Sequence, residues 1–224
     1  MKTFFNRKHL KNLSLLLFAM LLFSAAFTSC KKDKTDYKAF VMVTNSAQAS
    51  APQDFYVDGV KATSSAVAYG ESSNFLEVKA GEPEGAFKSS GTSTTNVSFD
   101  LQLANNFYYD IFYTDNNSYT VAPVDRSAPP SDKAKVRFIN LSSAVVSNVD
   151  FGIDGGDKLV SALGYTVASA YYNVDPSKTF AVYTSGSASV LLSIPATLQA
   201  GHIYTVYLSG ATSATLTFHT IAEN

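Results

Sequence analysis

The sequence predicts an all-β chain folded as two tandem Ig-like β-sandwich domains of the Greek-key type. First, the chain is rich in residues that favour strands, with 16 Phe and 13 Tyr among 224 residues, and it has few long helix-forming runs. Second, short stretches of alternating polar and apolar residues are separated by Gly, Asn and Asp. Third, turns and apolar positions recur after about 96 residues, which indicates two copies of one domain.

The repeat can be followed through turn and core positions. Asp54-Phe55 recurs as Asp150-Phe151, and Asp58-Gly59 recurs as Asp154-Gly155. The other matched positions are Asn45 with Asn140, Ala68-Tyr69 with Gly164-Tyr165, Phe75 with Tyr171, Leu101-Gln102 with Leu198-Gln199, Phe107 with Tyr204, Tyr109 with Val206, and Ile111 with Leu208. Between the copies, Pro129 and Pro130 cannot donate to a strand ladder and favour an extended spacer. We therefore expect a first domain over residues 38–124, a linker over 125–133 and a second domain over 134–224.

The N-terminal 29 residues have the organisation of a bacterial lipoprotein signal peptide. Four basic residues within positions 2–11 precede an apolar stretch over 13–26 that is too short to span a bilayer comfortably. Small residues then precede Cys30, the only cysteine, and the arrangement looks like a lipobox. We expect Cys30 to be lipidated and to begin the mature chain, followed by a polar tether over 30–37. The alternative is an ordinary secretory signal that leaves Cys30 as a free thiol.

Lipidation of Cys30 predicts the location of the protein. Two or three acyl chains, palmitate among them, bury enough methylenes to hold a protein on a membrane. We expect an outer-membrane lipoprotein in the envelope of a Gram-negative bacterium, either periplasmic or surface-exposed. The charged run over 31–36 does not choose between these faces.

Composition excludes several classes of partner and site. Removing the leader with its four basic residues leaves thirteen basic against eighteen acidic residues, a net charge of about −5. A nucleic-acid partner is not expected, because phosphate binding needs a basic surface. Without a cysteine beyond the anchor, the chain cannot form an internal disulfide, a thiolate nucleophile or a zinc–thiolate site. No cofactor is predicted.

Turn signals divide the first domain into short strands. Asp58-Gly59 follows an apolar stretch and can supply the positive φ angles of a tight hairpin turn. The expected strands are 39–44, 55–57, 75–78, 107–113 and 119–121. In the fourth of these, Phe107, Tyr109 and Ile111 should face inward. Across the chain this spacing predicts about seven strands in each domain.

The second domain repeats these features. Its opening strand over 135–140 places Val136 and Phe138 on one face and Lys135, Arg137 and Ile139 on the other. A strand over 151–153 then runs into Asp154-Gly155. Such alternation predicts sheets with one dry face and one solvated face.

Four segments together resemble the domain of unknown function 4397 family. They are 136–142 (VRFINLS), 149–155 (VDFGIDG), the tyrosine at 165 and 199–206 (QAGHIYTV). The resemblance extends over both repeats, although residues 40–43 and 103–108 of the first depart from the pattern. It implies small β-sandwich domains, often in tandem, on secreted and lipid-anchored bacterial proteins, and it implies no catalytic residues.

Acidic residues near the two Asp-Gly turns are the candidate metal ligands. They are Asp54 and Asp58 in the first repeat and Asp150, Asp154 and Asp157 in the second. Residues four apart on a strand share a face, and a hard cation such as calcium prefers several oxygens there. However, neither cluster has a closing bidentate Glu, and the turns already explain Asp58 and Asp154. We expect structural roles for these residues and no metal.

No group of residues predicts an enzyme. His202 and His219 are the only histidines beyond the leader, and neither has a nucleophile or a second ligand at a suitable spacing. We therefore expect no catalytic residues.

Outward-facing aromatic rings are the best candidates for ligand binding. Tyr108 and Phe112 should point away from the first core, and Tyr171-Tyr172 should place one ring on each face of its strand. We take Tyr108 and Tyr172 as candidate binding residues, which could stack on sugar rings or contact a protein. Contact with the neighbouring domain is the alternative interpretation, and the absence of Trp weakens the sugar interpretation.

The expected function is a non-enzymatic binding or adhesion module that holds a glycan or a partner protein near the outer membrane. The alternative is a structural or assembly component of an envelope protein complex, extended by pairing of strand edges.

Overall fold

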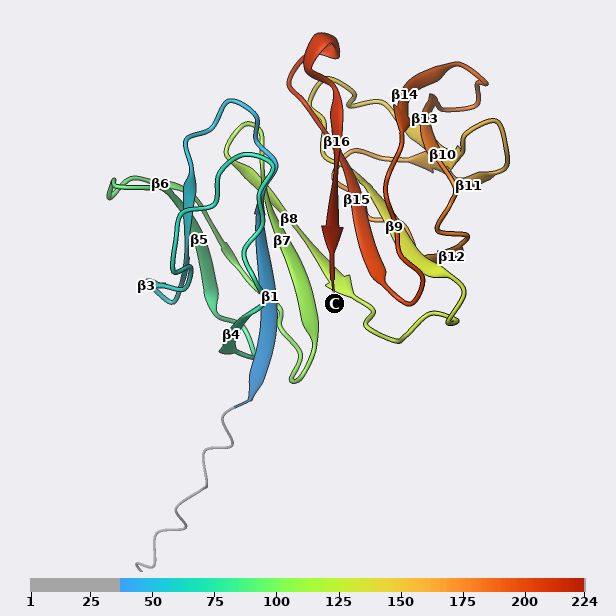
Figure 1. Ribbon diagram of the computed structural model, residues 1–224. Helices are drawn as coiled ribbons and strands as arrows, with labels where there is room; N and C mark the ends of the chain where they lie inside the picture. The colour runs from blue at the N-terminus through green and yellow to red at the C-terminus, as the bar shows by residue number, and fades with distance from the viewer. Residues whose placement is uncertain (1–36, 224) are drawn as a thin grey trace, which may run out of the picture. The chain divides into compact units, whose positions relative to one another are not determined.

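The computed structural model describes residues 37–223, and its regular structure is β-strands with one short 3-10 turn (Figure 1). The first half holds β1 (Lys38–Asn45), β2 (Gln53–Val57), β3 (Val60–Lys61), β4 (Leu76–Lys79), β5 (Glu84–Ser89), β6 (Thr95–Asp100), β7 (Tyr108–Thr114) and β8 (Ser118–Val124). The second holds β9 (Ala134–Asn140), β10 (Val149–Ile153), β11 (Lys158–Leu163), β12 (Tyr172–Val174), β13 (Phe180–Thr184), β14 (Val190–Ile194), β15 (Ile203–Ser209) and β16 (Thr217–Ala222), with the 3-10 turn Ser213–Thr215 before β16. The all-β class is confirmed, with eight strands in each half.

Each half is a sandwich of two four-stranded sheets, and the two halves have the same strand order. The first half has sheets β4-β1-β7-β8 and β3-β2-β5-β6, and the second has β12-β9-β15-β16 and β11-β10-β13-β14. In both, the opening strand pairs in parallel with the seventh strand, as Phe40 with Tyr108 and Val136 with Tyr204. The repeat in the sequence is therefore a repeat of topology.

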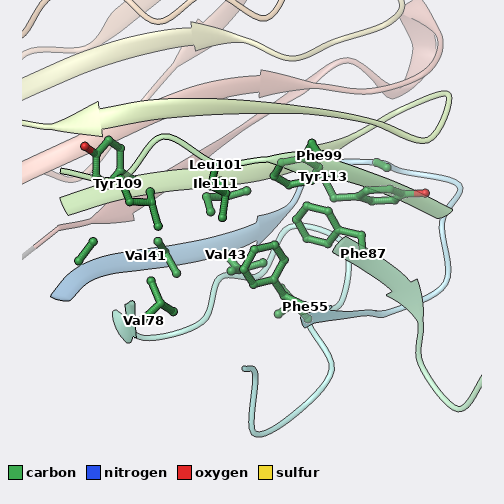
Figure 2. Packing of buried hydrophobic residues seen from close by; sticks show 14 residues of the cluster. Val41, Val43, Phe55, Val78, Phe87, Phe99, Leu101, Tyr109, Ile111 and Tyr113 are labelled. Atoms are coloured by element: carbon green, nitrogen blue, oxygen red, sulfur yellow. The ribbon is translucent and has the colours of Figure 1, made fainter. Parts of the chain in front are cut away.

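Aromatic side chains fill the core of each sandwich. In the first, Phe55 and Phe87 come from one sheet and pack with ring centroids 5.0 Å apart, and Tyr113 of the other sheet lies 5.1 Å from Phe87 (Figure 2). In the second, Phe138 lies 4.8 Å from Phe151. Burial of one such side chain contributes about 1.5–3 kcal/mol to folding, so these cores stabilise the chain without disulfides.

The Asp-Gly hairpin predicted in the first repeat is confirmed. Asp58 and Gly59 join β2 to β3 with φ angles of +49° and +76°, as a two-residue hairpin turn requires. The Asp58 carboxylate also accepts a 2.9 Å hydrogen bond from the Glu84 backbone N–H. The second repeat differs, because four residues over 154–157 join β10 to β11 and only Gly155 of the Asp-Gly pair has a positive φ.

The prediction of one solvated face is wrong for sheets β4-β1-β7-β8 and β12-β9-β15-β16. Their outer faces pack against each other at a surface that we call the junction. Its buried apolar residues are Met42, Phe112, Ala122, Ile139, Leu141, Tyr207 and Ile221. Phe112 and Tyr207 meet edge to face with centroids 5.5 Å apart. Residues 125–133 therefore connect two sandwiches in contact and do not act as a spacer between them.

Most of the N-terminal segment lies before the residues that the structure describes. The signal peptide, Cys30 and the tether up to residue 36 precede the first described residue, Tyr37. Within residues 37–223 the structure has no helix with the length and apolar character that a bilayer crossing needs.

Candidate functional site

A groove of about 600 Å³ opens where the two sandwiches meet. The first sandwich contributes residues 106–108, 123 and 124, the connection contributes 125–127, and the second sandwich contributes Arg137, Ala168, Ser169 and Tyr171. Three aromatic rings, two arginines and one aspartate are among the lining residues. This volume lies within the usual range for ligand clefts, and apolar walls with a few polar groups are typical of such clefts.

The loop before β7 holds Phe107 at the groove. Asn106 has φ +63° and donates a 2.7 Å backbone hydrogen bond to the Lys38 carbonyl, which ties the loop to the start of β1. Phe107 consequently lies outside the core with 56% of its surface exposed. Its predicted inward orientation is wrong because β7 begins one residue later, whereas Tyr109 and Ile111 do face the core.

Tyr108 lies on the outer face of its sheet, as predicted, but three side chains surround its ring. Phe40 stacks on it at 4.6 Å and Phe75 meets it edge-on at 5.1 Å. The guanidinium carbon of Arg126 lies 4.4 Å from the Tyr108 ring centroid and 5.3 Å from that of Phe75. Tyr108 therefore supports Arg126, and a sugar could stack on its ring only after displacing a neighbour.

Arg126 is an exposed cation without an acidic partner within residues 37–223. Its neighbour in sequence, Asp125, instead pairs with Lys135 at 2.6 Å. Hydrogen bonds from Lys135 and Ser127 lower the pKa of Asp125 to about 2. The carboxylate beside Arg126 is thus ionised but neutralised by another residue.

A buried network lies beneath the groove and joins the two sandwiches. Arg137 on β9 donates from Nη2 to Asp110 on β7 at 2.7 Å and from Nη1 to the Pro123 carbonyl at 2.6 Å. Its Nε donates at 2.8 Å to Thr205, whose hydroxyl donates to Glu223. None of these charged groups is more than 2% exposed. All three donating nitrogens of Arg137 are therefore occupied within the protein.

The two carboxyl groups of this network favour binding a proton. Burial raises the pKa of Asp110, although Arg137 opposes the effect. Burial raises the pKa of Glu223 to about 8, and the nearby Asp110 is the second largest cause of this increase. At neutral pH Glu223 is therefore mostly protonated, and Asp110 is the carboxyl group that pairs with Arg137. Because Asp110 and Glu223 are buried, a ligand in the groove would not reach them, and the network stabilises the junction.

Tyr171, just before β12, and Tyr172, its first residue, place one ring on each side, as predicted, and Tyr171 is the one that lines the groove. Its ring centroid lies 4.9 Å from the guanidinium carbon of Arg137 and 5.2 Å from the Lys135 nitrogen. Burial raises the pKa of the Tyr171 hydroxyl. Tyr172 packs against the core of the second sandwich. Of the two candidate binding residues, the groove thus includes Tyr108 and not Tyr172.

The acidic candidates serve turns and loops. Buried Asp150 accepts hydrogen bonds from the backbone N–H groups of Ala162 and Gly186 at 2.8 and 3.1 Å, and Lys158 lies 3.3 Å away. Burial acts to raise the pKa of Asp150, but these hydrogen bonds hold it below its usual value. Asp154 and Asp157 are exposed on the turn. Among the described residues, no three Asp, Glu, His or Cys side chains gather closely enough to hold a metal ion.

Both histidines lie away from the groove lining. His219 stacks on Tyr207 at 4.9 Å, and burial lowers its pKa, so it is neutral at neutral pH. His202 is half-buried near Tyr204.

Residues 39–147 match the family model described as Domain of unknown function (DUF4397). This match supports the resemblance found in the sequence. The range matched by DUF4397 covers nearly all of the first sandwich, the connection and strand β9, whereas the segments that carried the resemblance lie in the second repeat. No curated protein matches the chain.

Three solved structures show distant similarity. CBMbc (family CBM26) from Eubacterium rectale Amy13K, in complex with maltoheptaose, is 10% identical, with 83% of this chain and 97% of that chain covered and a TM-score of 0.29. A streptococcal virulence factor described as binding α-glucan is 9% identical, with 81% and 96% covered and a TM-score of 0.26. The glycogen-degrading pneumococcal virulence factor SpuA is 8% identical, with 83% and 22% covered and a TM-score of 0.24. Similarity at such low TM-scores supports no statement about the ligand of this chain.

Proposed function

We propose that the protein is a non-enzymatic binding module of the cell envelope, and that its ligand site is the groove between the two sandwiches. The observation that carries the proposal is one groove that combines an exposed ring, Phe107, with a cation, Arg126, that forms no ion pair within the described residues 37–223. Grooves of this kind bind ligands through apolar contact, while a few polar groups fix orientation. The ligand is a glycan or a partner protein, since both offer apolar faces bordered by polar groups.

Binding without turnover is the activity that the site supports best. A general acid or base must come within hydrogen-bond reach of the group that it protonates. The two carboxyl groups with raised pKa values, Asp110 and Glu223, are at most 1% exposed, and Asp125 is held by Lys135. These arrangements favour recognition over catalysis.

The test is glycan-array binding by the lipidated protein, followed by calorimetry with the oligosaccharides that bind. Phe107→Ala and Tyr171→Phe change the groove, and Tyr119→Ala is the matched control, because Tyr119 is 37% exposed but stacks on Phe99 outside the groove lining. Phe107→Ala should lower affinity about tenfold, as expected for loss of one stacked ring. Equal binding by Phe107→Ala and wild type would place the ligand elsewhere.

The proposal includes anchoring at the outer membrane through lipid on Cys30. Its support is the order of basic, apolar and small residues before that cysteine. Six residues lie between Cys30 and Tyr37, and an extended chain over these seven residue steps reaches about 25 Å at most. Metabolic labelling with palmitate should label the wild type but not Cys30→Ala, which should leave the membrane fraction. An unlabelled wild type in the medium would contradict this location.

A second candidate function, assembly with other envelope proteins, is favoured by the edge strand β14. Val190 and Leu191 are 51% and 40% exposed, and residues 185–196 contain no charged side chain. Natural edge strands usually carry charges that prevent pairing with other chains. Crosslinking in intact cells should then give discrete protein adducts that Leu191→Lys removes.

A further inference from the structure

We propose that the groove selects an acidic oligosaccharide, one that contains uronate residues, and that Arg126 binds the sugar carboxylate. This inference rests on the proposed function and names its ligand class. A uronate residue has an apolar ring face, which can pack on Phe107, and a carboxylate on the same sugar, which can bind Arg126.

The position of Arg126 suits an anion. Its guanidinium group lies over the Tyr108 and Phe75 rings, at 4.4 and 5.3 Å from the centroids. A cation–π contact orients the group through its face and does not use its N–H donors. Those donors can therefore form a bidentate pair with a carboxylate, the geometry that a planar guanidinium favours.

Charges around the groove also favour an anion. The lining contains Arg126, Arg137 and Asp125. Lys135 neutralises Asp125 at 2.6 Å, and Asp110 neutralises Arg137 at 2.7 Å. The remaining charge at the groove is the positive charge of Arg126, although the whole chain is slightly acidic, with a formal net charge of −1.

The apolar part of the groove favours a sugar over a small inorganic anion. Phe107 is 56% exposed and offers a ring on which the C–H face of a pyranose can pack. Asn106, Ser127 and Ser169 also line the groove and provide polar groups for hydroxyls. A neutral glucan would gain no charge-assisted hydrogen bond from Arg126, whereas phosphate alone would make no contact with Phe107.

The test is isothermal titration calorimetry of the lipidated protein in detergent. The probes are oligogalacturonate, oligoalginate and hyaluronate fragments, with maltotetraose as the neutral comparison. We expect at least one uronate oligosaccharide to bind about tenfold or more tightly than maltotetraose, as one charge-assisted hydrogen-bonded pair provides. Because this pair is exposed, its affinity should fall as salt rises.

The variants are Arg126→Gln, Arg126→Lys and Lys88→Gln. Arg126→Gln should lower uronate affinity about 10- to 100-fold, and Arg126→Lys should restore part of it by keeping the charge. Lys88→Gln should change nothing, although Lys88 makes the same kind of contact, 4.4 Å from the Tyr56 centroid, outside the groove lining. Thermal unfolding that matches the wild type will show that each variant is folded.

The outcomes separate this inference from the proposed function. Equal binding of uronate and neutral oligosaccharides, lowered by Phe107→Ala but not by Arg126→Gln, would overturn the acidic ligand and leave the groove as the binding site. Binding of inorganic phosphate or anionic vesicles through Arg126, without any oligosaccharide binding, would overturn the sugar. No binding of any probe would overturn the acidic sugar and count against a glycan as the ligand.

Discussion

Arg137 is the residue whose role differs most from its pattern in the sequence. Alternation along residues 135–140 correctly places it opposite Val136 and Phe138, on a face expected to meet solvent. In the structure it is 2% exposed and paired with Asp110 of the first sandwich. No local signal predicts this pairing, because the partner lies 27 residues away in another domain.

Removing Arg137 should strongly destabilise the protein. Arg137→Met leaves Asp110 buried without its cation, and breaking a buried ion pair in this way costs about 3–5 kcal/mol. Urea unfolding followed by tyrosine fluorescence measures the change. Glu77→Gln is the control, because the Lys38–Glu77 pair is 50% and 53% exposed and such pairs contribute about 1 kcal/mol or less. Equal losses for the two variants would contradict a buried role for Arg137.

Glu223 should make stability depend on pH. Its folded-state pKa is raised from 4.5 to about 8, so between these values the folded state holds a proton that the unfolded state has lost. The resulting stability is complete below about pH 4.5 and is lost as pH rises through about 8. Unfolding free energies from pH 5 to 9 should therefore fall by a few kcal/mol in the wild type.

The matched variant for this pH dependence is Glu223→Gln, which cannot ionise. Its stability should decline less over the same interval. An equally steep decline in Glu223→Gln would assign the titration to another group, with Asp110 the nearest one.

At the scale of single elements, turn chemistry was the part of the fold that the sequence predicted best. Asp58-Gly59 forms the expected two-residue hairpin, and β1, β7 and β9 lie within one residue of their expected bounds. The groove was harder to predict. Its loop begins β7 one residue late and turns Phe107 outward, and Tyr171 rather than Tyr172 faces the groove because Tyr172 packs into the second core.

Glycine positions in two turns should respond differently to substitution. Gly59 and Gly210 have φ angles of +76° and +120°, which are unfavourable for other residues. A Cβ at Gly59 would meet no atom within 4 Å, whereas one at Gly210 would lie 2.4 Å from the Thr215 carbonyl oxygen. Gly59→Ala should cost about 1–2 kcal/mol, and Gly210→Ala should cost more because backbone must move.

Chemical denaturation of both glycine variants measures this difference. The Gly210 carbonyl accepts hydrogen bonds from the Ser142 hydroxyl at 2.7 Å and the Ala144 N–H at 3.2 Å, so the segment cannot shift without losing them. A cost for Gly210→Ala no larger than that for Gly59→Ala would mean that the turn before the 3-10 segment adapts freely.

At the scale of the whole molecule, the sequence predicted two sandwiches but not their contact. The sequence of β15 did contain one signal that its sheet is covered on both faces. Strand β15 has apolar residues at consecutive positions, Val206, Tyr207 and Leu208, and a strand without alternation is typical of a sheet that is buried on both faces. In the structure Val206 and Leu208 face the second core, and Tyr207 faces the junction.

Contact at the junction should couple the unfolding of the two sandwiches. We expect the wild type to unfold in one calorimetric transition. Phe112→Ala removes a fully buried ring that meets Tyr207 at 5.5 Å, and such truncations cost about 3–5 kcal/mol. Because Phe112→Ala weakens the contact between the sandwiches, the variant should show two transitions.

Phe87→Ala is the control, since Phe87 is equally buried within the first core and its truncation destabilises that sandwich directly. Two transitions in the wild type, unchanged by Phe112→Ala, would show that the sandwiches fold independently and that the groove between them is not held in one geometry.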